Sequence, residues 1–160
     1  MRNRKYSGGK FSPEQYKNCN DFGISRITNY LKSRGYNVHE KEEEDYDVDI
    51  VAEKNGKVFK YEAETKSHYP FTSVEDYKFD TVSFLGRKKK YHERHKEGFY
   101  YCILCIETEC LVYCHSSKIF KDEYKIEREL NTKHRKGADE FYLVPKEDCS
   151  FINISANASL

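Results

Sequence analysis

Four ionisable side chains lie near the middle of the sequence, at Asp49, Glu62, Glu64 and Lys66. The last three occupy alternate positions, which places them on one face of an extended strand because strand side chains alternate with a period of two. Carboxylate oxygens, few in number and leaving room for water, suit Mg²⁺ or Mn²⁺. Such an ion can polarise a phosphodiester and generate hydroxide from bound water, so the spacing points to metal-assisted hydrolysis.

A tight turn at Asn55-Gly56 joins two runs of strand-forming residues, 48–52 and 58–61. Asn-Gly between such runs is the strongest short-range signal for a β-hairpin. A two-residue turn pairs Lys54 with Lys57, and this pairing fixes the register of the whole hairpin.

The predicted register sets Asp49 opposite Glu62 and Asp47 opposite Glu64. Directly opposed residues have Cβ atoms about 4.5–5.5 Å apart, so these carboxylates repel one another. A divalent cation bound between them is the simplest compensation. The alternative interpretation is an edge hairpin whose charges face water, since edge strands favour charged residues.

The segment Asp49-Ile50-Val51-Ala52, then a short charged turn and Tyr61-Glu62-Ala63-Glu64-Thr65, resembles the signature of the PD-(D/E)XK, or restriction-endonuclease-like, nucleases. In appearance it is most similar to Holliday junction resolvases and related archaeal and phage enzymes, over roughly residues 20–66. The resemblance implies an α/β fold with an αβββαβ core, in which helices flank a mixed central sheet. It also implies bound Mg²⁺ or Mn²⁺ and hydrolysis of nucleic-acid phosphodiesters, with DNA as the expected partner.

Two alignments of the family motif remain open. In the first, Asp49 and Glu62 take the two acidic positions, and Glu64 falls where the family usually has lysine. In the second, the (Asp/Glu)-x-Lys unit runs from Glu64 to Lys66, with Asp47 or Asp49 as its partner. We favour the first, which implies that Asp49, Glu62 and Glu64 ligate the metal. Lys66 then stands beside the attacked phosphate.

Two further sets of residues are candidates for accessory roles. An acidic residue of the first helix often assists in this family, and Asp21 is the best candidate here. The densest basic run, Arg87-Lys88-Lys89-Lys90, would contact the phosphate backbone if it lies on a helix after the hairpin. A solvated helix face explains this run equally well. A second basic segment, residues 133–136, has a weaker claim.

Cysteine and histidine residues between positions 102 and 115 invite a zinc interpretation. Within a strand, however, Cys102 and Cys105 point to opposite faces, so chelation would break the most hydrophobic strand of the chain. We therefore expect buried core cysteines. Six cysteines without an export signal indicate reduced thiols in an intracellular, cytoplasmic protein.

The 160 residues carry a net charge of +1, which by itself does not point to nucleic acid. No apolar run approaches the length of a membrane span. We expect a flexible basic arm over residues 1–11 and a single nuclease-like domain over 12–160. So compact a domain suggests a phage or mobile-element nuclease, or a small resolvase-like homodimer.

The remaining pattern predicts the elements that position the hairpin. A helix starts at Ser12-Pro13 and ends near Gly35, and a short strand follows over 36–40. Two central strands are expected over 99–106 and 111–115. Further elements are expected as helices over about 84–96 and 118–130, and as a terminal hairpin of 141–144 with 151–154. This order indicates a mixed α/β domain.

Three hypotheses follow for function. The first is a Mg²⁺-dependent endonuclease that cuts DNA with metal-activated water. The second is a non-catalytic module of the same fold that binds nucleic acid or a protein partner, because Glu64 stands where the family usually has lysine. The third is a plain α/β domain whose acidic hairpin is ordinary surface.

Overall fold

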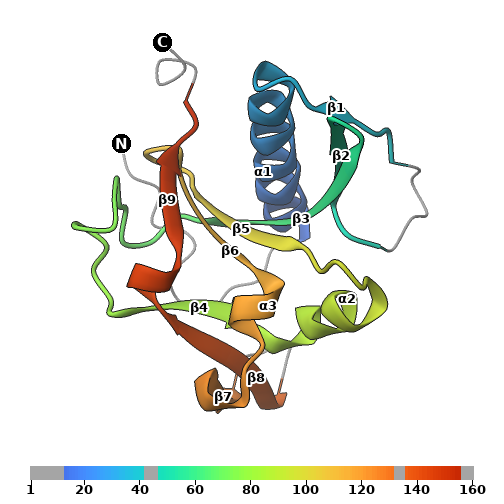
Figure 1. Ribbon diagram of the computed structural model, residues 1–160. Coiled ribbons are helices and arrows are strands. Elements are labelled where there is room, and N and C mark those ends of the chain that lie inside the picture. The colour runs from blue at the N-terminus through green and yellow to red at the C-terminus, as the bar shows by residue number, and fades with distance from the viewer. Residues whose placement is uncertain (1–12, 42–46, 132–135, 156–160) are drawn as a thin grey trace.

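The computed structural model describes residues 13–41, 47–131 and 136–155 (Figure 1). They form an α/β fold with a mixed six-stranded sheet, a separate three-stranded sheet and few helices. The predicted arm at 1–11, the capping residue Ser12 and most of the basic segment 133–136 lie outside the described residues. Among the described helices, none is long and apolar enough to cross a membrane.

Helix α1 (Pro13–Ser33) is continuous and ends where the sequence predicts. Gly35 has a φ of +88°, a left-handed conformation that glycine adopts without a Cβ clash. The Tyr36 amide donates back to the Leu31 carbonyl over this turn. The helix buries Ile27 and Leu31 against the larger sheet.

The larger sheet has the strand order β1-β2-β3-β5-β6-β9. Only β3 and β5 pair in parallel, and the other neighbours are antiparallel. The bounds of the strands are β1 Asn37–Val38, β2 Ile50–Lys54, β3 Lys57–Lys66, β5 Tyr100–Cys105, β6 Cys110–His115 and β9 Ser150–Asn153.

The β2–β3 hairpin has the register that the sequence predicts. Asn55 and Gly56 have φ values of 53° and 78°, as expected for a tight turn with two left-handed residues. Lys54 pairs with Lys57, and the ladder continues without a bulge to Ile50 opposite Tyr61. One further step along this register places Asp49 beside Glu62.

The smaller sheet has the antiparallel order β4-β8-β7. Its strands are β4 (Thr81–Leu85), β7 (Lys125–Asn131) and β8 (Lys136–Pro145). This sheet lies across the face of the larger sheet that α1 does not cover (Figure 1). The larger sheet is therefore enclosed between a helix and a second sheet.

Two apolar clusters fill the spaces on either side of the larger sheet. The cluster on the α1 side contains Ala63, Cys102 and Leu104. The cluster on the other side contains Tyr101 and Ile103 of β5, packed with residues of β4 and β8. Successive residues of β5 thus enter opposite clusters, as strand alternation requires.

Two predicted helices are wrong in part or in whole. Residues 81–85 form β4, because Val82 and Phe84 alternate with half-buried neighbours and are fully buried themselves. Only short helices follow, η1 (Gly86–Lys88) and α2 (Lys89–Arg94). Residues 118–130 contain the end of α3 (Ser116–Ile119), then η2 (Asp122–Tyr124) and β7.

The predicted terminal hairpin is also wrong. Strand β8 pairs with β4 and β7, whereas β9 pairs with β6 in the other sheet. The short helix η3 (Lys146–Asp148) carries the chain between the two sheets. By contrast, the prediction of core cysteines is confirmed for Cys102, Cys105, Cys110 and Cys114, all of which are buried.

Candidate active site

A cavity of about 790 Å³ lies between β3 and the smaller sheet. The polar face of β3 forms one wall, because Glu62, Glu64 and Lys66 all line this cavity. The opposite wall consists of residues of β4 and β8, and the loop of residues 67–80 closes one side. The alternating residues singled out from the sequence therefore face one cavity, which is open to solvent on one side.

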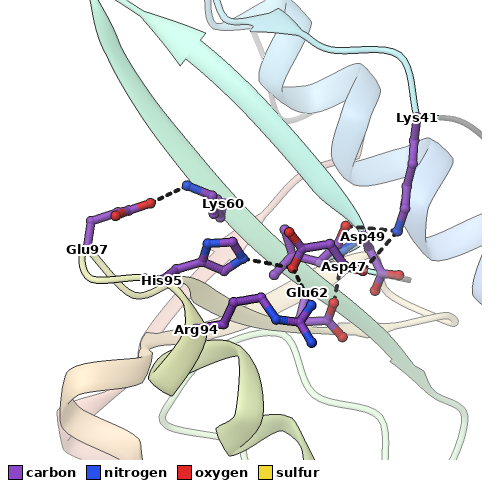
Figure 2. A network of polar contacts seen from close by, with 9 residues as sticks. Lys41, Asp47, Asp49, Lys60, Glu62, Arg94, His95 and Glu97 are labelled. Atoms are coloured by element: carbon purple, nitrogen blue, oxygen red, sulfur yellow. Dashed lines mark hydrogen bonds and ion pairs between the residues drawn. The ribbon is translucent and has the colours of Figure 1, made fainter. Parts of the chain in front are cut away.

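The carboxylates of Asp49 and Glu62 each accept a hydrogen bond from a backbone amide of the facing strand segment. The Asp49 amide donates to Glu62 Oε1 at 2.9 Å, and Asp49 Oδ2 accepts from the Ala63 amide at 2.9 Å. Strand β2 begins one residue later, at Ile50, so these bonds continue the hairpin beyond its ladder. Figure 2 shows the two carboxylates beside one another at the end of the hairpin.

Glu62 is a buried acid with only 2% of its surface exposed. Burial first, and the neighbouring Asp49 carboxylate second, raise the pKa of Glu62 to about 7, while Lys88 acts in the opposite direction. Oε2 lies 2.7 Å from Lys88 Nζ and forms an ion pair with it.

Lys88 reaches this acid from η1, on the far side of the cavity. Burial lowers the pKa of Lys88, but the Glu62 carboxylate outweighs it, so the pKa lies above its usual value. Lys88 thus points into the cavity instead of standing on a solvated helix face. Arg87 also lines the cavity, whereas Lys89 does not and Lys90 lies on the exposed surface over the Tyr91 ring.

Glu64 is held by a tyrosine of the neighbouring parallel strand. The Tyr101 hydroxyl donates to Glu64 Oε1 at 2.7 Å and accepts from the Leu85 amide at 3.3 Å. Tyr101 is almost fully buried, and burial followed by the Glu64 charge raises its pKa well above the usual value. The hydroxyl is therefore a fixed donor that orients Glu64 at the cavity wall.

Asp47 pairs with residues at the end of α2. Its Oδ1 lies 2.7 Å from His95 Nε2 and 3.2 Å from an Arg94 guanidinium nitrogen, both at the end of α2 (Figure 2). Burial raises the pKa of Asp47, but the His95 hydrogen bond and the Arg94 charge outweigh it and leave the pKa below its usual value. Lys41 further ties this segment by donating to the Asp47 and Val48 carbonyls. Asp47 thus anchors the hairpin to α2.

Asp21, the accessory candidate on α1, does not lie at the cavity, whereas the two residues before it do. Asp21 is exposed and does not line the cavity, whereas Cys19 and Asn20 do. The helix therefore borders the cavity, but at residues that the sequence analysis did not select.

The carboxylates of the site differ from the metal-ligand set that the sequence predicts. Within the described part of the chain, no three His, Cys, Asp or Glu side chains are grouped as metal ligands. The structure brings Asp49 and Glu62 together but holds Glu64 on Tyr101, so the predicted three-ligand set is not assembled. Two carboxylates nevertheless fit Mg²⁺, which commonly takes one or two with waters and substrate phosphates. Asp49 and Glu62 are the residues that would hold such an ion.

Sequence reasoning did not predict the roles of two residues of this site. The basic run that contains Lys88 is predicted to contact the phosphate backbone or to form a solvated helix face, and its pairing with Glu62 is not predicted. Tyr101 and Tyr100 begin an otherwise apolar strand, which is a usable signal, but the parallel β3–β5 register that brings Tyr101 to Glu64 cannot be inferred from local spacing. Comparison with known proteins adds no further assignment: no protein-family model, curated protein or solved structure matches the chain.

Proposed function

We propose that the chain is a Mg²⁺- or Mn²⁺-dependent nuclease of the restriction-endonuclease-like type, acting on nucleic-acid phosphodiesters, with DNA the expected substrate. The observation that carries the proposal is the Glu62 carboxylate. It is buried beside a second carboxylate, that of Asp49, at the wall of a large cavity. The two adjacent carboxylates share one neighbouring lysine, Lys88, an arrangement that is costly for stability alone and that supports a bound cation.

The order of the elements also supports the proposal. Helix α1 precedes the antiparallel strands β1, β2 and β3, and α2 then leads to β5, which lies parallel to β3. This succession agrees with the αβββαβ core that the sequence resemblance implies, with β4 added before α2. The acidic hairpin thus contributes one of the two central strands of the sheet, β3, and its neighbour β2.

Four residues of the site have defined roles in the proposed reaction. Asp49 and Glu62 would hold the ion, which when bound activates water and neutralises charge on the phosphate. Lys88 places a cation beside the same carboxylate, where it stabilises negative charge that develops on the attacked phosphate. Glu64, fixed by Tyr101, is positioned to accept a proton from water within the cavity.

A second candidate is a non-catalytic module of the same fold. Lys88 already neutralises Glu62 in the absence of an added ion, and Glu64 stands where the family usually has lysine. Both observations favour a site that binds nucleic acid through its basic residues without cutting it. Turnover separates the two candidates.

The experiment is incubation of the protein with end-labelled single-stranded, duplex and branched DNA and with RNA, in Mg²⁺, Mn²⁺ or EDTA. The matched control to Glu62→Gln is Glu97→Gln, a glutamate that also pairs with a lysine but stands on the surface. We expect metal-dependent cleavage by the wild type and by Glu97→Gln, and none by Glu62→Gln. Binding without cleavage under every condition would favour the non-catalytic module.

A further inference from the structure

Two large aromatic side chains are exposed at the edge of the cavity. Tyr69 is 54% exposed and Phe79 is 45% exposed, although most aromatic residues of the chain are at least partly buried. Both belong to the loop of residues 67–80, and both line the cavity that contains Glu62. Aromatic rings this exposed beside a charged cavity call for an explanation, because in the described part of the chain much of each ring stays open to solvent.

The rings form an ordered pair. The Tyr69 and Phe79 centroids are 5.2 Å apart with an interplanar angle of 88°, and Lys78 Nζ lies 4.2 Å from the Tyr69 centroid. Tyr69 also has a φ of 54°, a left-handed conformation that is unfavourable for a bulky residue. Such strain persists only where the surroundings fix it, and it is concentrated at binding sites.

The loop that carries this pair is fixed by several contacts, although it has no regular structure. Asp76 accepts from the Thr72 and Ser73 amides at its start. Thr108 Oγ1 donates to the Phe71 carbonyl, and Lys146 Nζ donates to the Tyr77 carbonyl. The rings of Phe71 and Tyr77 pack beneath, 5.0 Å apart and buried. The exposed pair is therefore held in place before any ligand binds.

Cations surround the same opening. Arg87, Arg128, Lys66 and Lys78 all line the cavity, from four different parts of the chain. Guanidinium and ammonium groups around an aromatic pair match the two components of a nucleotide, its phosphate and its base. An intact duplex cannot present a free base face to these rings, because its bases are stacked on one another.

We propose that the perpendicular rings of Tyr69 and Phe79 form a platform for an unpaired base, one ring stacking on the face of the base and the other bordering its edge, so that the substrate is single-stranded nucleic acid or the unpaired part of a branched one. The inference deepens the proposed function and rests on it for the scissile site. Lys78, Arg87 and Arg128 hold the adjoining phosphates, which directs the backbone toward Glu62.

The test is binding of an oligonucleotide that carries 2-aminopurine, measured in EDTA so that no cleavage occurs. The fluorescence of this base is quenched when it stacks, and the chain contains no tryptophan to interfere. We expect quenching and tight binding for the single strand, and neither for the same strand in a duplex. The same measurement with a DNA strand and with an RNA strand shows which sugar the site accepts.

Tyr69→Gly removes the ring at a φ that glycine adopts freely, and Phe79→Ala removes the second ring. Each should weaken single-strand binding on the order of tenfold or more and abolish the quenching. Val58→Ala removes an apolar residue of similar exposure at the hairpin turn, outside the cavity, and should change neither.

Equal affinity for single strand and duplex, or unchanged quenching in Tyr69→Gly and Phe79→Ala, would overturn the inference. Its failure is distinguishable from failure of the proposed function. Stacking that depends on Tyr69, in a protein that never cleaves, would support the platform and contradict the nuclease proposal. Metal-dependent cleavage that prefers duplex DNA and is unchanged in both aromatic variants would support the nuclease proposal and contradict the platform.

Discussion

Lys88 Nζ lies 2.7 Å from Oε2 of Glu62 inside the fold, where both residues line the same cavity. The pair joins η1 to the central strand β3, two elements that the sequence separates by the whole of β4 and its preceding loop. The Lys88 ammonium lowers the pKa of Glu62, whereas burial raises it. The predictions below follow from this relationship.

The stability of the metal-free protein should depend on pH through Glu62. Its pKa is about 7 in the folded protein against 4.5 ordinarily, so the folded state keeps a proton that the unfolded chain releases between these values. Glu62 contributes its full share to the free energy of unfolding below about pH 4.5. As the pH rises through about 7, the free energy of unfolding falls by roughly 3 kcal/mol.

Urea unfolding across this pH range, with EDTA present, measures the effect. The comparison is the difference between wild type and Glu62→Gln, since other groups titrate in both proteins. We expect that difference to change with pH over the range in which Glu62 ionises. Parallel pH profiles for the two proteins would show that Glu62 ionises in the folded state as it does in the unfolded chain.

Lys88→Met should reduce cleavage on the order of 10²–10³-fold, because it removes a cation positioned at the attacked phosphate. It should also raise the pH at which metal binds, because Glu62 loses the charge that favours its ionised form. Lys90→Met, two residues along on the exposed surface, is the matched control and should behave as wild type. A greater loss in Lys66→Met than in Lys88→Met would return the catalytic role to Lys66.

Asp49→Asn should abolish metal binding without unfolding the protein, because the amide oxygen can still accept from the Ala63 amide. Asp47→Asn should retain metal binding and lose a modest amount of stability, since it weakens the contact with Arg94 and His95. Calorimetric titration and thermal melts of the two variants separate these outcomes. The reverse result would favour the alignment in which Asp47 is the partner of Glu64.

Tyr101→Phe should lower stability by about 1 kcal/mol or somewhat more, because Glu64 and the Leu85 amide lose the hydroxyl between them. If Tyr101 positions Glu64 for proton transfer, the variant should also shift the pH profile of the cleavage rate while leaving metal affinity unchanged. Tyr113→Phe, on β6 and outside the cavity, is a suitable control. An identical pH profile in Tyr101→Phe would assign Tyr101 to the core alone.

Local signals predicted the parts of the fold that local physics determines. The Asn55-Gly56 turn fixed the β2–β3 register, and that register in turn placed Asp49 beside Glu62. Likewise, Gly35 marked the end of α1 through a conformation that few other residues adopt. In each case the decisive interaction spans only a few residues of chain or follows from one turn.

The errors arose where long-range pairing decides the structure. Strand β7 is rich in charged residues and looks helical, but pairing with β8 overrides this tendency. The basic run at 87–90 carries no sign that Lys88 pairs with an acid inside the fold, because its partner Glu62 belongs to a distant strand. The platform formed by Tyr69 and Phe79 was missed for the same reason, since loop anchors such as Thr108 and Lys146 lie far along the chain.

The most direct test of the central claim, that Glu62 and Asp49 form a metal centre, is calorimetric titration with Mn²⁺ above the pKa of Glu62. We expect saturable binding by the wild type and by Glu97→Gln, and loss of binding in Glu62→Gln. Saturation should also raise the wild-type melting temperature, since a ligand at a hundred times its Kd stabilises by about 2.7 kcal/mol. Absence of heat and of any melting shift in the wild type, or equal binding by Glu62→Gln, would contradict the account.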